Sequence, residues 1–165
     1  MKVSNKMAEV SFNKDFFRII TMSQGMFFYA DPDAPSLYLD PNVADIELGR
    51  ALRSALEKSK SVSTEVFQEI FHSGEIERIS QERDAFAMKN YAHKSKKSMQ
   101  KKTSICTVTV NEEIEIQPTH QNSLGSYTVK KDKGPYVLRF PLGLTDTELG
   151  AAVREGFNYC TSSVR

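Results

Sequence analysis

An eleven-residue stretch occurs twice in this chain, and this repeat constrains the fold more than any other feature. Residues 43–53 read VADIELGRALR and residues 144–154 read LTDTELGAAVR, with Asp, Glu, Leu, Gly, Ala and Arg at identical spacing. An alternating apolar stretch and a proline, Pro41 or Pro141, precede each copy. Internal recurrence is typical of a duplicated supersecondary unit, so we expect two units in which strands are followed by a helix.

The repeated stretch carries the signals of a helix start. Thr145 and Glu148 have the spacing of a capping box; in the first copy alanine replaces the threonine, so Asp45 is the expected cap there. Apolar residues then recur at the spacing of one helix face. Glycine inside a helix costs about 0.5–1 kcal/mol relative to alanine. Gly49 and Gly150 therefore predict a close contact of each helix with the sheet or with the other helix, the alternative being simple tolerance of glycine near a helix start.

The order of these signals predicts an α+β fold in which an antiparallel sheet is built from two pseudo-repeated units, each a β-meander plus a helix. We expect one domain over residues 1–165, because this length suffices for a hydrophobic core. The first unit covers 12–60, a helical insertion covers 63–100 and the second unit covers 104–160.

Within these units, alternating apolar residues predict the strands and 3.6-residue periodicity predicts the helices. Strands are expected at 16–20, 26–29, 37–39, 105–110, 113–117, 127–129 and 136–140. Helices are expected at 45–58, after a cap at Ser63 or Thr64, from Glu75 onward, and in the second repeat. Residues 118–126 are expected to form a polar loop, and residues 161–165 to be frayed.

The charge balance and the cysteine content indicate which partners and which cellular compartment to expect. The 22 Lys and Arg residues nearly balance 21 acidic ones, so charge demands neither nucleic acid nor a membrane as partner. No apolar run reaches the length of a membrane span, and the N-terminus lacks the apolar core of a signal peptide. Cys106 and Cys160 fit no metal or redox spacing. We expect them to be reduced core thiols, which favours the cytoplasm.

The stretch Lys89–Lys102 contains six lysines and no acidic residue. Such a run is compatible with a phosphate-binding patch. It is equally typical of a solvated helix end, where lysine suits the negative end of the dipole. Because no aromatic ladder or arginine fork accompanies the lysines, the second interpretation is favoured.

The sequence predicts no catalytic site, metal site or cofactor. His72, His93 and His120 lie far apart and share no metal-ligand spacing, and neither a phosphate-binding glycine loop nor a nucleophile elbow occurs. Asp31 and Asp33 flank a proline, and a turn explains them better than a bound cation. An enzyme is therefore not expected.

Several segments together resemble a known family. DFFRI (15–19), YADP (29–32), DIELGRA (45–51) and IQPTH (116–120) occur in this order, and ELGAAVR (148–154) and Cys160 follow. In order and joint presence they resemble the immunity proteins of bacterial contact-dependent growth inhibition systems. The resemblance covers both ends of the chain well and the helical middle poorly.

The resemblance implies a binding protein rather than an enzyme. It would be a cytoplasmic monomer that forms a 1:1 complex with the C-terminal toxin domain of a large secreted protein and neutralises it. In similar pairs the toxin is a nuclease, commonly a metal-dependent DNase. Some members accept a toxin β-hairpin onto their sheet, where backbone hydrogen bonds supply affinity and alternating side-chain pockets supply specificity.

We expect the open sheet edge and its rim to be formed by the first hairpin and the 118–135 loop. The candidate toxin-binding residues are polar or aromatic and lie on turns beside sheet edges, although ordinary loop composition is the competing explanation. They are Tyr29, Asp31, Asp33, His120, Gln121, Asn122 and Tyr127.

A different class of function starts from the duplication itself. Two copies of a strand meander plus helix resemble Whirly-type single-stranded DNA-binding proteins, and a lysine run could follow a nucleic acid backbone. Near-neutral charge and the lack of regularly spaced aromatic residues argue against this alternative, so direct nucleic-acid binding is not expected.

Overall fold

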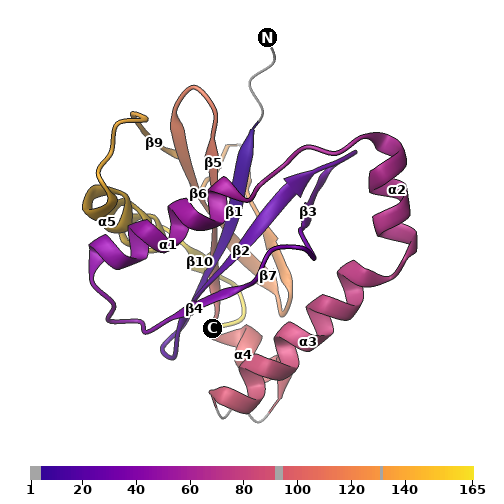
Figure 1. Ribbon diagram of the computed structural model, residues 1–165. Coiled ribbons are helices and arrows are strands. Elements are labelled where there is room, and N and C mark those ends of the chain that lie inside the picture. Colours follow the sequence, from indigo (N-terminus) through magenta and orange to yellow (C-terminus); the bar gives the residue numbers. More distant parts are fainter. Residues whose placement is uncertain (1–4, 92–94, 131) are drawn as a thin grey trace.

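The structure is a computed structural model, which describes residues 5–91, 95–130 and 132–165. Within these residues a large sheet has seven strands in the order β3-β2-β1-β5-β6-β9, with β4 also pairing to β2 (Figure 1). All of its strand pairs are antiparallel. The strands are β1 (Lys6–Phe12), β2 (Phe17–Gln24), β3 (Phe28–Ala30), β4 (Leu37–Leu39), β5 (Ser104–Val110), β6 (Ile114–Pro118) and β9 (Leu138–Phe140).

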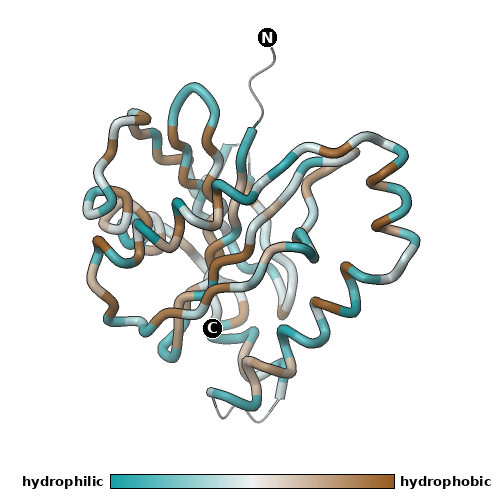
Figure 2. The backbone as a smooth tube through the Cα atoms, in the orientation of Figure 1, coloured by the Kyte–Doolittle hydropathy of each residue, from teal (hydrophilic) through white to brown (hydrophobic). Residues whose placement is uncertain are grey.

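Two helices, α1 (Asp45–Glu57) and α5 (Asp146–Phe157), lie side by side across one face of the large sheet (Figure 1). Because side chains alternate along a strand, every second residue of the central strands points toward these helices. Ala8, Val10, Cys106 and Val108 are fully buried there. Figure 2 shows the hydrophobic residues gathered in this layer and hydrophilic ones at the tip of the β5–β6 hairpin. The main core therefore lies between the sheet and the repeated helices.

The two repeated stretches contact each other directly at their glycines. A Cβ on Gly49 would overlap the backbone carbonyl oxygen of Asp146, and a Cβ on Gly150 would overlap that of Asp45. The predicted close contact is thus confirmed, and its partner is the other helix. Only glycine lets the two backbones approach this closely.

Reciprocal ion pairs frame the glycine contact. Arg53 Nε donates to Asp146 Oδ1 at 2.7 Å, and Arg154 Nε donates to Asp45 Oδ1 at 2.7 Å. Each guanidinium also donates to a backbone carbonyl just before the partner helix: Arg53 to Leu144 O, and Arg154 to Val43 O. The arginine and the aspartate of the repeat therefore join the two copies.

The cap of the second helix is confirmed, and that of the first is not. Thr145 Oγ1 accepts from the Glu148 N–H, and a Glu148 carboxylate oxygen accepts from the Thr145 N–H. In α1 the N-cap is Ala44, which provides no side-chain bond. Asp45, the expected cap, is the first helical residue, and its carboxylate binds Arg154 instead.

The two units are related by the central pair β1–β5. Strands β1, β2 and β4 with α1 correspond in order and pairing to β5, β6 and β9 with α5, which confirms the predicted pseudo-repeat. The first strand was missed: β1 carries Glu9 in its middle and precedes the expected start at residue 16. In addition, β3 and β4 both pair with the long strand β2, so the first unit is not a simple meander.

Between the units, α2 (Thr64–His72), α3 (Glu75–Asn90) and α4 (Lys96–Lys101) form a helical arm that extends beyond β3 and returns below the sheet (Figure 1). Ser63 caps α2 as predicted, and Gly74 separates α2 from α3 with a φ of 80°. The arm contacts the sheet through a small second core of Phe16, Ala87 and Met99. This core lies on the opposite face of β2 from α1, because Phe16 and Phe17 alternate.

A small second sheet has the order β10-β7-β8 and contains β7 (His120–Ser123), β8 (Ser126–Thr128) and β10 (Thr161–Ser162). Two predictions fail here. The polar loop 118–126 contains a strand, and the tail is held in parallel pairing to β7, with Ser163 N–H donating to Gln121 O. Polar residues form these strands because tertiary pairing outweighs their weak intrinsic preference.

Candidate functional site

The outer face of the large sheet, opposite α1 and α5, carries charged residues in its centre. Glu9 lies opposite Ile20 and Ser11 lies opposite Arg18 in the β1–β2 pairing, so Glu9 and Arg18 are diagonal neighbours on one face. The arm and β8 rise on either side of them and enclose a cavity of about 250 Å³, which we call the Arg18 cleft. Its lining comprises Glu9, Phe16, Arg18, Ile20, Ser80, Arg83, Asp84, Lys96, Met99, Gln100, Thr103, Ile105, Gly125 and Tyr127.

Arg18 is the least satisfied group in the cleft. Its side chain is only 13% exposed, and its Nε and Nη1 atoms are buried without a hydrogen-bond partner among the described residues. The carboxylate of Asp84 lies 3.8 Å from Nη1 and is shared with Lys96, whose Nζ is 3.1 Å away. Buried polar groups nearly always have partners, so these two donors make Arg18 a candidate contact for a ligand.

Burial shifts the pKa of two further ionisable groups in the cleft. Burial raises the pKa of the Glu9 carboxyl, although the positive charges of Arg18 and Arg83 oppose this. Burial also lowers the pKa of the Arg83 guanidinium, and the like charge of Arg18 acts in the same direction. Charges in such a partly enclosed site interact strongly with a ligand that displaces water from it.

The β7–β8 wall of the cleft is braced by two of the predicted site residues. The Tyr127 hydroxyl donates to Thr103 O at 2.7 Å and accepts from Gln121 Nε2 at 3.1 Å. Gln121 is fully buried, and its Nε2 also donates to Gln100 O at 2.7 Å. Tyr127 therefore lines the cleft, and Gln121 fixes it in place.

The residues predicted on the first hairpin lie elsewhere, beside α2. Tyr29 is buried against Phe67, at 5.5 Å between ring centroids. Asp31 is buried, accepts from the Asp33 N–H at 2.9 Å and lies 3.8 Å from Lys60 Nζ; this is the turn-forming role that the sequence favoured. Asp33 is exposed. Among the described residues no direct hydrogen bond, ion pair or ring contact joins this group to β7 or β8.

The last two predicted residues face away from the cleft lining. His120 has Nδ1 2.7 Å from Thr161 Oγ1 and Nε2 2.7 Å from Ser163 Oγ, so it binds the C-terminal segment. Asn122 is exposed and donates to Thr128 Oγ1 at 2.7 Å.

The residues missed by the sequence had one visible signal. Glu9 and Arg18 are single charges within alternating apolar strands, which usually marks a solvated face. The covering helices that place Arg83 and Asp84 above them carry no comparable signal in the sequence.

The structure offers little for metal or membrane chemistry. In residues 5–91, 95–130 and 132–165 no three His, Cys, Asp or Glu side chains converge so that they could hold a metal ion. None of the helices in these ranges combines the length and apolar character that crossing a bilayer requires. His93 and Lys94 lie outside the described residues, and the lysine run otherwise contributes Lys96 to the Asp84 pair.

Comparison with known proteins places this duplicated scaffold with its polar cleft in a family. The CdiI family model, described as CDI immunity protein, matches residues 6–160, and the chain belongs to this family. It is similar to the immunity protein CdiI-YPIII of Yersinia pseudotuberculosis serotype O:3 (strain YPIII), with 25% identity over 171 residues that cover 96% of this chain and 97% of the relative. The resemblance seen in the sequence is thereby confirmed.

Two solved structures share the fold. One is a chain of the CdiA-CT/CdiI toxin and immunity complex from Yersinia pseudotuberculosis, with a TM-score of 0.84, 23% identity and coverage of 96% of this chain and 98% of that chain. The other is the protein of unknown function NMB0488 from Neisseria meningitidis, with a TM-score of 0.88, 17% identity and coverage of 97% and 98%. The α+β architecture is therefore shared with both solved structures.

Proposed function

We propose that this protein binds the C-terminal toxin domain of a cognate contact-dependent growth inhibition effector in the cytoplasm and neutralises it in a 1:1 complex. The observation that carries this proposal is the match of residues 6–160 to the CDI immunity family. The relative from Yersinia pseudotuberculosis is an immunity protein by name, and a similar fold occurs in a toxin and immunity complex.

We place the toxin contact at the Arg18 cleft and the free edge of β8. β8 ends the small sheet in the described chain, so an added strand would pair with its outer backbone groups. Alternate side chains of that strand would enter the cleft, where Nε and Nη1 of Arg18 have no hydrogen-bond partner among the described residues. The incoming hairpin should therefore carry a carboxylate or amide oxygen at the position facing Arg18.

The toxin is proposed to be a nuclease, as the family resemblance implies. The net charge of this chain is +1, so it lacks the strong negative field with which an inhibitor would imitate a nucleic acid. Strand addition at β8 inhibits without such imitation. It also leaves the chemistry entirely to the toxin, so the immunity protein needs neither a cofactor nor a catalytic group.

Co-expression with the C-terminal toxin domain of the cognate effector tests the function. The parent should restore growth and co-purify with that domain with a Kd of about 1 nM or below, on the order of −12 kcal/mol. Chromosomal DNA that is degraded without the parent and intact with it identifies the toxin as a DNase. Growth arrest despite stable expression of the parent would contradict the function.

Matched variants test the site. Arg18→Met removes the free donors, whereas Arg78→Met removes an exposed arginine that pairs with Glu75 and Glu82 on the arm. We expect Arg18→Met to weaken toxin binding about 100-fold, because a buried charged hydrogen bond is lost, and Arg78→Met to bind like the parent. Equal affinities for both variants would move the site away from the cleft while leaving the function intact.

Single-stranded DNA binding is checked in the same preparation. Tight binding that falls steeply with salt would favour the nucleic-acid alternative over toxin neutralisation.

A further inference from the structure

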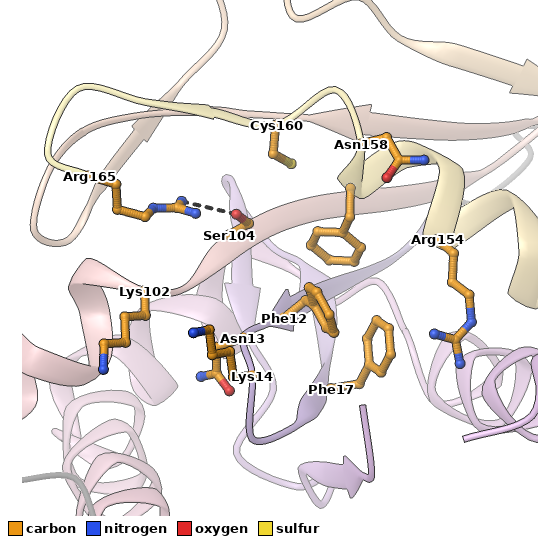
Figure 3. Close-up of a pocket in the computed structure, with 11 residues that line it drawn as sticks. Phe12, Asn13, Lys14, Phe17, Lys102, Ser104, Arg154, Asn158, Cys160 and Arg165 are labelled. Atoms are coloured by element: carbon orange, nitrogen blue, oxygen red, sulfur yellow. Dashed lines mark hydrogen bonds between the residues drawn. The ribbon is translucent and has the colours of Figure 1, made fainter. Parts of the chain in front are cut away.

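A second cavity lies on the helix side of the large sheet, where β1 turns into β2 and α5 ends (Figure 3). It has a volume of about 530 Å³, and we call it the Cys160 pocket. Its floor is aromatic: the Phe12 ring centroid lies 4.5 Å from that of Phe17 and 5.4 Å from that of Phe157. It lies apart from the Arg18 cleft, because Phe17 and Arg18 point to opposite faces of β2.

The rim of the Cys160 pocket carries one sign of charge. Its four charged lining residues are all cationic, and no acidic residue in the described chain lines it. Arg154 is paired with Asp45, and Arg165 donates to Ser104 and Gln121. The amino groups of Lys14 and Lys102 have no ion-pair partner among the described residues. A pocket with apolar walls and one sign of charge concentrates small anions.

A pair of thiols lies at the edge of this pocket. Cys160 lines it, while Cys106 is fully buried behind it in the main core. The two sulfur atoms are 3.6 Å apart, although the residues are 54 positions apart in the chain. A disulfide bond is about 2.05 Å long, so both are free thiols in contact.

The pair is electrostatically asymmetric. The hydrogen bond with the Cys106 thiol lowers the pKa of Cys160; burial opposes this, and the Thr119 backbone and the charge of Arg165 add to the lowering. The same hydrogen bond and burial raise the pKa of Cys106. The accessible sulfur is therefore the better thiolate, and the thiolate is the reactive form of cysteine.

We propose that Cys160 is a modification site for anionic low-molecular-weight disulfides, with oxidised glutathione as the type, and that Cys106 resolves the adduct. The carboxylates of the disulfide bind the cationic rim, and its peptide body covers the phenylalanine floor. The lining residues of this site are distinct from those of the Arg18 cleft.

The exchange proceeds in two steps that balance. The Cys160 thiolate attacks one sulfur of the small disulfide, forms a mixed disulfide and releases one thiolate. The Cys106 sulfur then attacks the Cys160 sulfur and passes its proton to the leaving thiolate, which forms the Cys106–Cys160 disulfide and releases the second small thiol. The two protein thiols are oxidised by two electrons, and the small disulfide is reduced to two thiols.

The test compares three disulfides on the full parent chain: oxidised glutathione (anionic), hydroxyethyl disulfide (neutral) and cystamine (cationic). Samples are quenched with acid, alkylated and weighed intact. We expect oxidised glutathione to react about tenfold faster than cystamine at low salt, and the preference to vanish at 1 M salt. Equal rates for the three reagents in low salt would overturn the pocket's role.

Variants separate the two steps. Cys106→Ser should accumulate the mixed disulfide on Cys160, Cys160→Ser should remain unmodified, and the parent should end as the internal disulfide. Lys14→Glu combined with Lys102→Glu should reverse the preference toward cystamine, whereas Lys58→Glu, which lies outside the pocket, should not. A parent that keeps two alkylatable thiols, or that traps glutathione without losing it, overturns the proposal. The reagent comparison needs no variant, so it stands even if a cysteine substitution unfolds the chain.

Discussion

The two faces of the large sheet differ in how completely their polar groups are hydrogen-bonded within the chain. On the helix face, the duplicated arginines, aspartates and glycines of α1 and α5 satisfy each other reciprocally. On the outer face, two buried donors of Arg18 have no hydrogen-bond partner among the described residues, and burial raises the pKa of Glu9. Strand β2 contributes to both faces, because its side chains point alternately to one face and the other. The comparison indicates that the polar groups of the helix face satisfy one another, whereas those of the outer face do so incompletely among the described residues.

The largest effect is expected from a substitution at the point where α1 and α5 are closest to each other. In Gly49→Ala the new Cβ would overlap the backbone carbonyl of Asp146. A backbone cannot move aside as a side chain does, so we expect the free energy of unfolding to fall by about 3 kcal/mol, well beyond the helix-propensity gain of about 1 kcal/mol. Urea unfolding measures the change.

Gly143→Ala is the matched control for that substitution. A Cβ on Gly143 meets nothing within 4 Å, so its stability should stay within about 0.5 kcal/mol of the parent. If Gly49→Ala were as stable as Gly143→Ala, the close helix contact would not be a requirement of the fold.

The sequence predicted the helix face of the large sheet better than the outer face. The helix face was readable because its determinants are local and repeated: the capping box of Thr145, the apolar stripes, and a glycine at the same place twice. The outer face was not readable, since the cleft depends on α3 and α4 folding over β1 and β2. No local pattern reports that long-range contact.

The misses have the same physical cause. β7 and β10 have few apolar residues and owe their pairing to each other and to the buried Gln121, so polar composition suggested a loop and a frayed tail. Tyr127 and Gln121 were selected because they are aromatic or polar groups beside an edge, and the structure places Tyr127 in the cleft lining and Gln121 against it. The same reasoning also selected Asp31, whose carboxylate serves its own turn.

A pair of arginine substitutions compares the two faces directly. Arg53→Met removes a guanidinium that bonds both Asp146 and Leu144 O, and we expect a loss of about 1.5 kcal/mol. Arg18→Met removes a guanidinium without hydrogen bonds in the described chain, and the Asp84 carboxylate that lies 3.8 Å from it keeps Lys96 as a partner at 3.1 Å. We therefore expect a smaller loss, of about 0.5 kcal/mol. Thermal or urea unfolding of both variants checks this. Equal losses would show that the outer face is as much a structural element as the helix face.

Removal of the Tyr127 hydroxyl tests whether this group braces the β7–β8 wall of the cleft. Tyr127→Phe deletes the donor to Thr103 O and the acceptor for Gln121 Nε2, and we expect a loss of about 1 kcal/mol. Tyr136→Phe is the control, because Tyr136 is 68% exposed and its single bond, to Asp132 O, lies at the surface. Hydrogen exchange at the β7–β8 amides should accelerate in the first variant and stay unchanged in the second; identical exchange in both would mean that Tyr127 does not brace the wall.

The smallest effect concerns the pH dependence of the outer face. Burial raises the pKa of Glu9 above its ordinary value of 4.5, against the opposing charges of Arg18 and Arg83. The folded state then holds this proton more tightly than the unfolded state, so Glu9 makes stability fall as pH rises from 4.5 through the raised pKa. Glu9→Gln cannot ionise, and its unfolding free energy relative to the parent should increase across that interval and then level off. Unfolding curves from pH 4 to 8 measure the difference, with the exposed Glu69→Gln as the control for loss of one charge. A difference that does not change with pH would mean that Glu9 ionises as readily in the folded protein as in the unfolded chain. The outer face around Glu9 would then behave as a solvated surface.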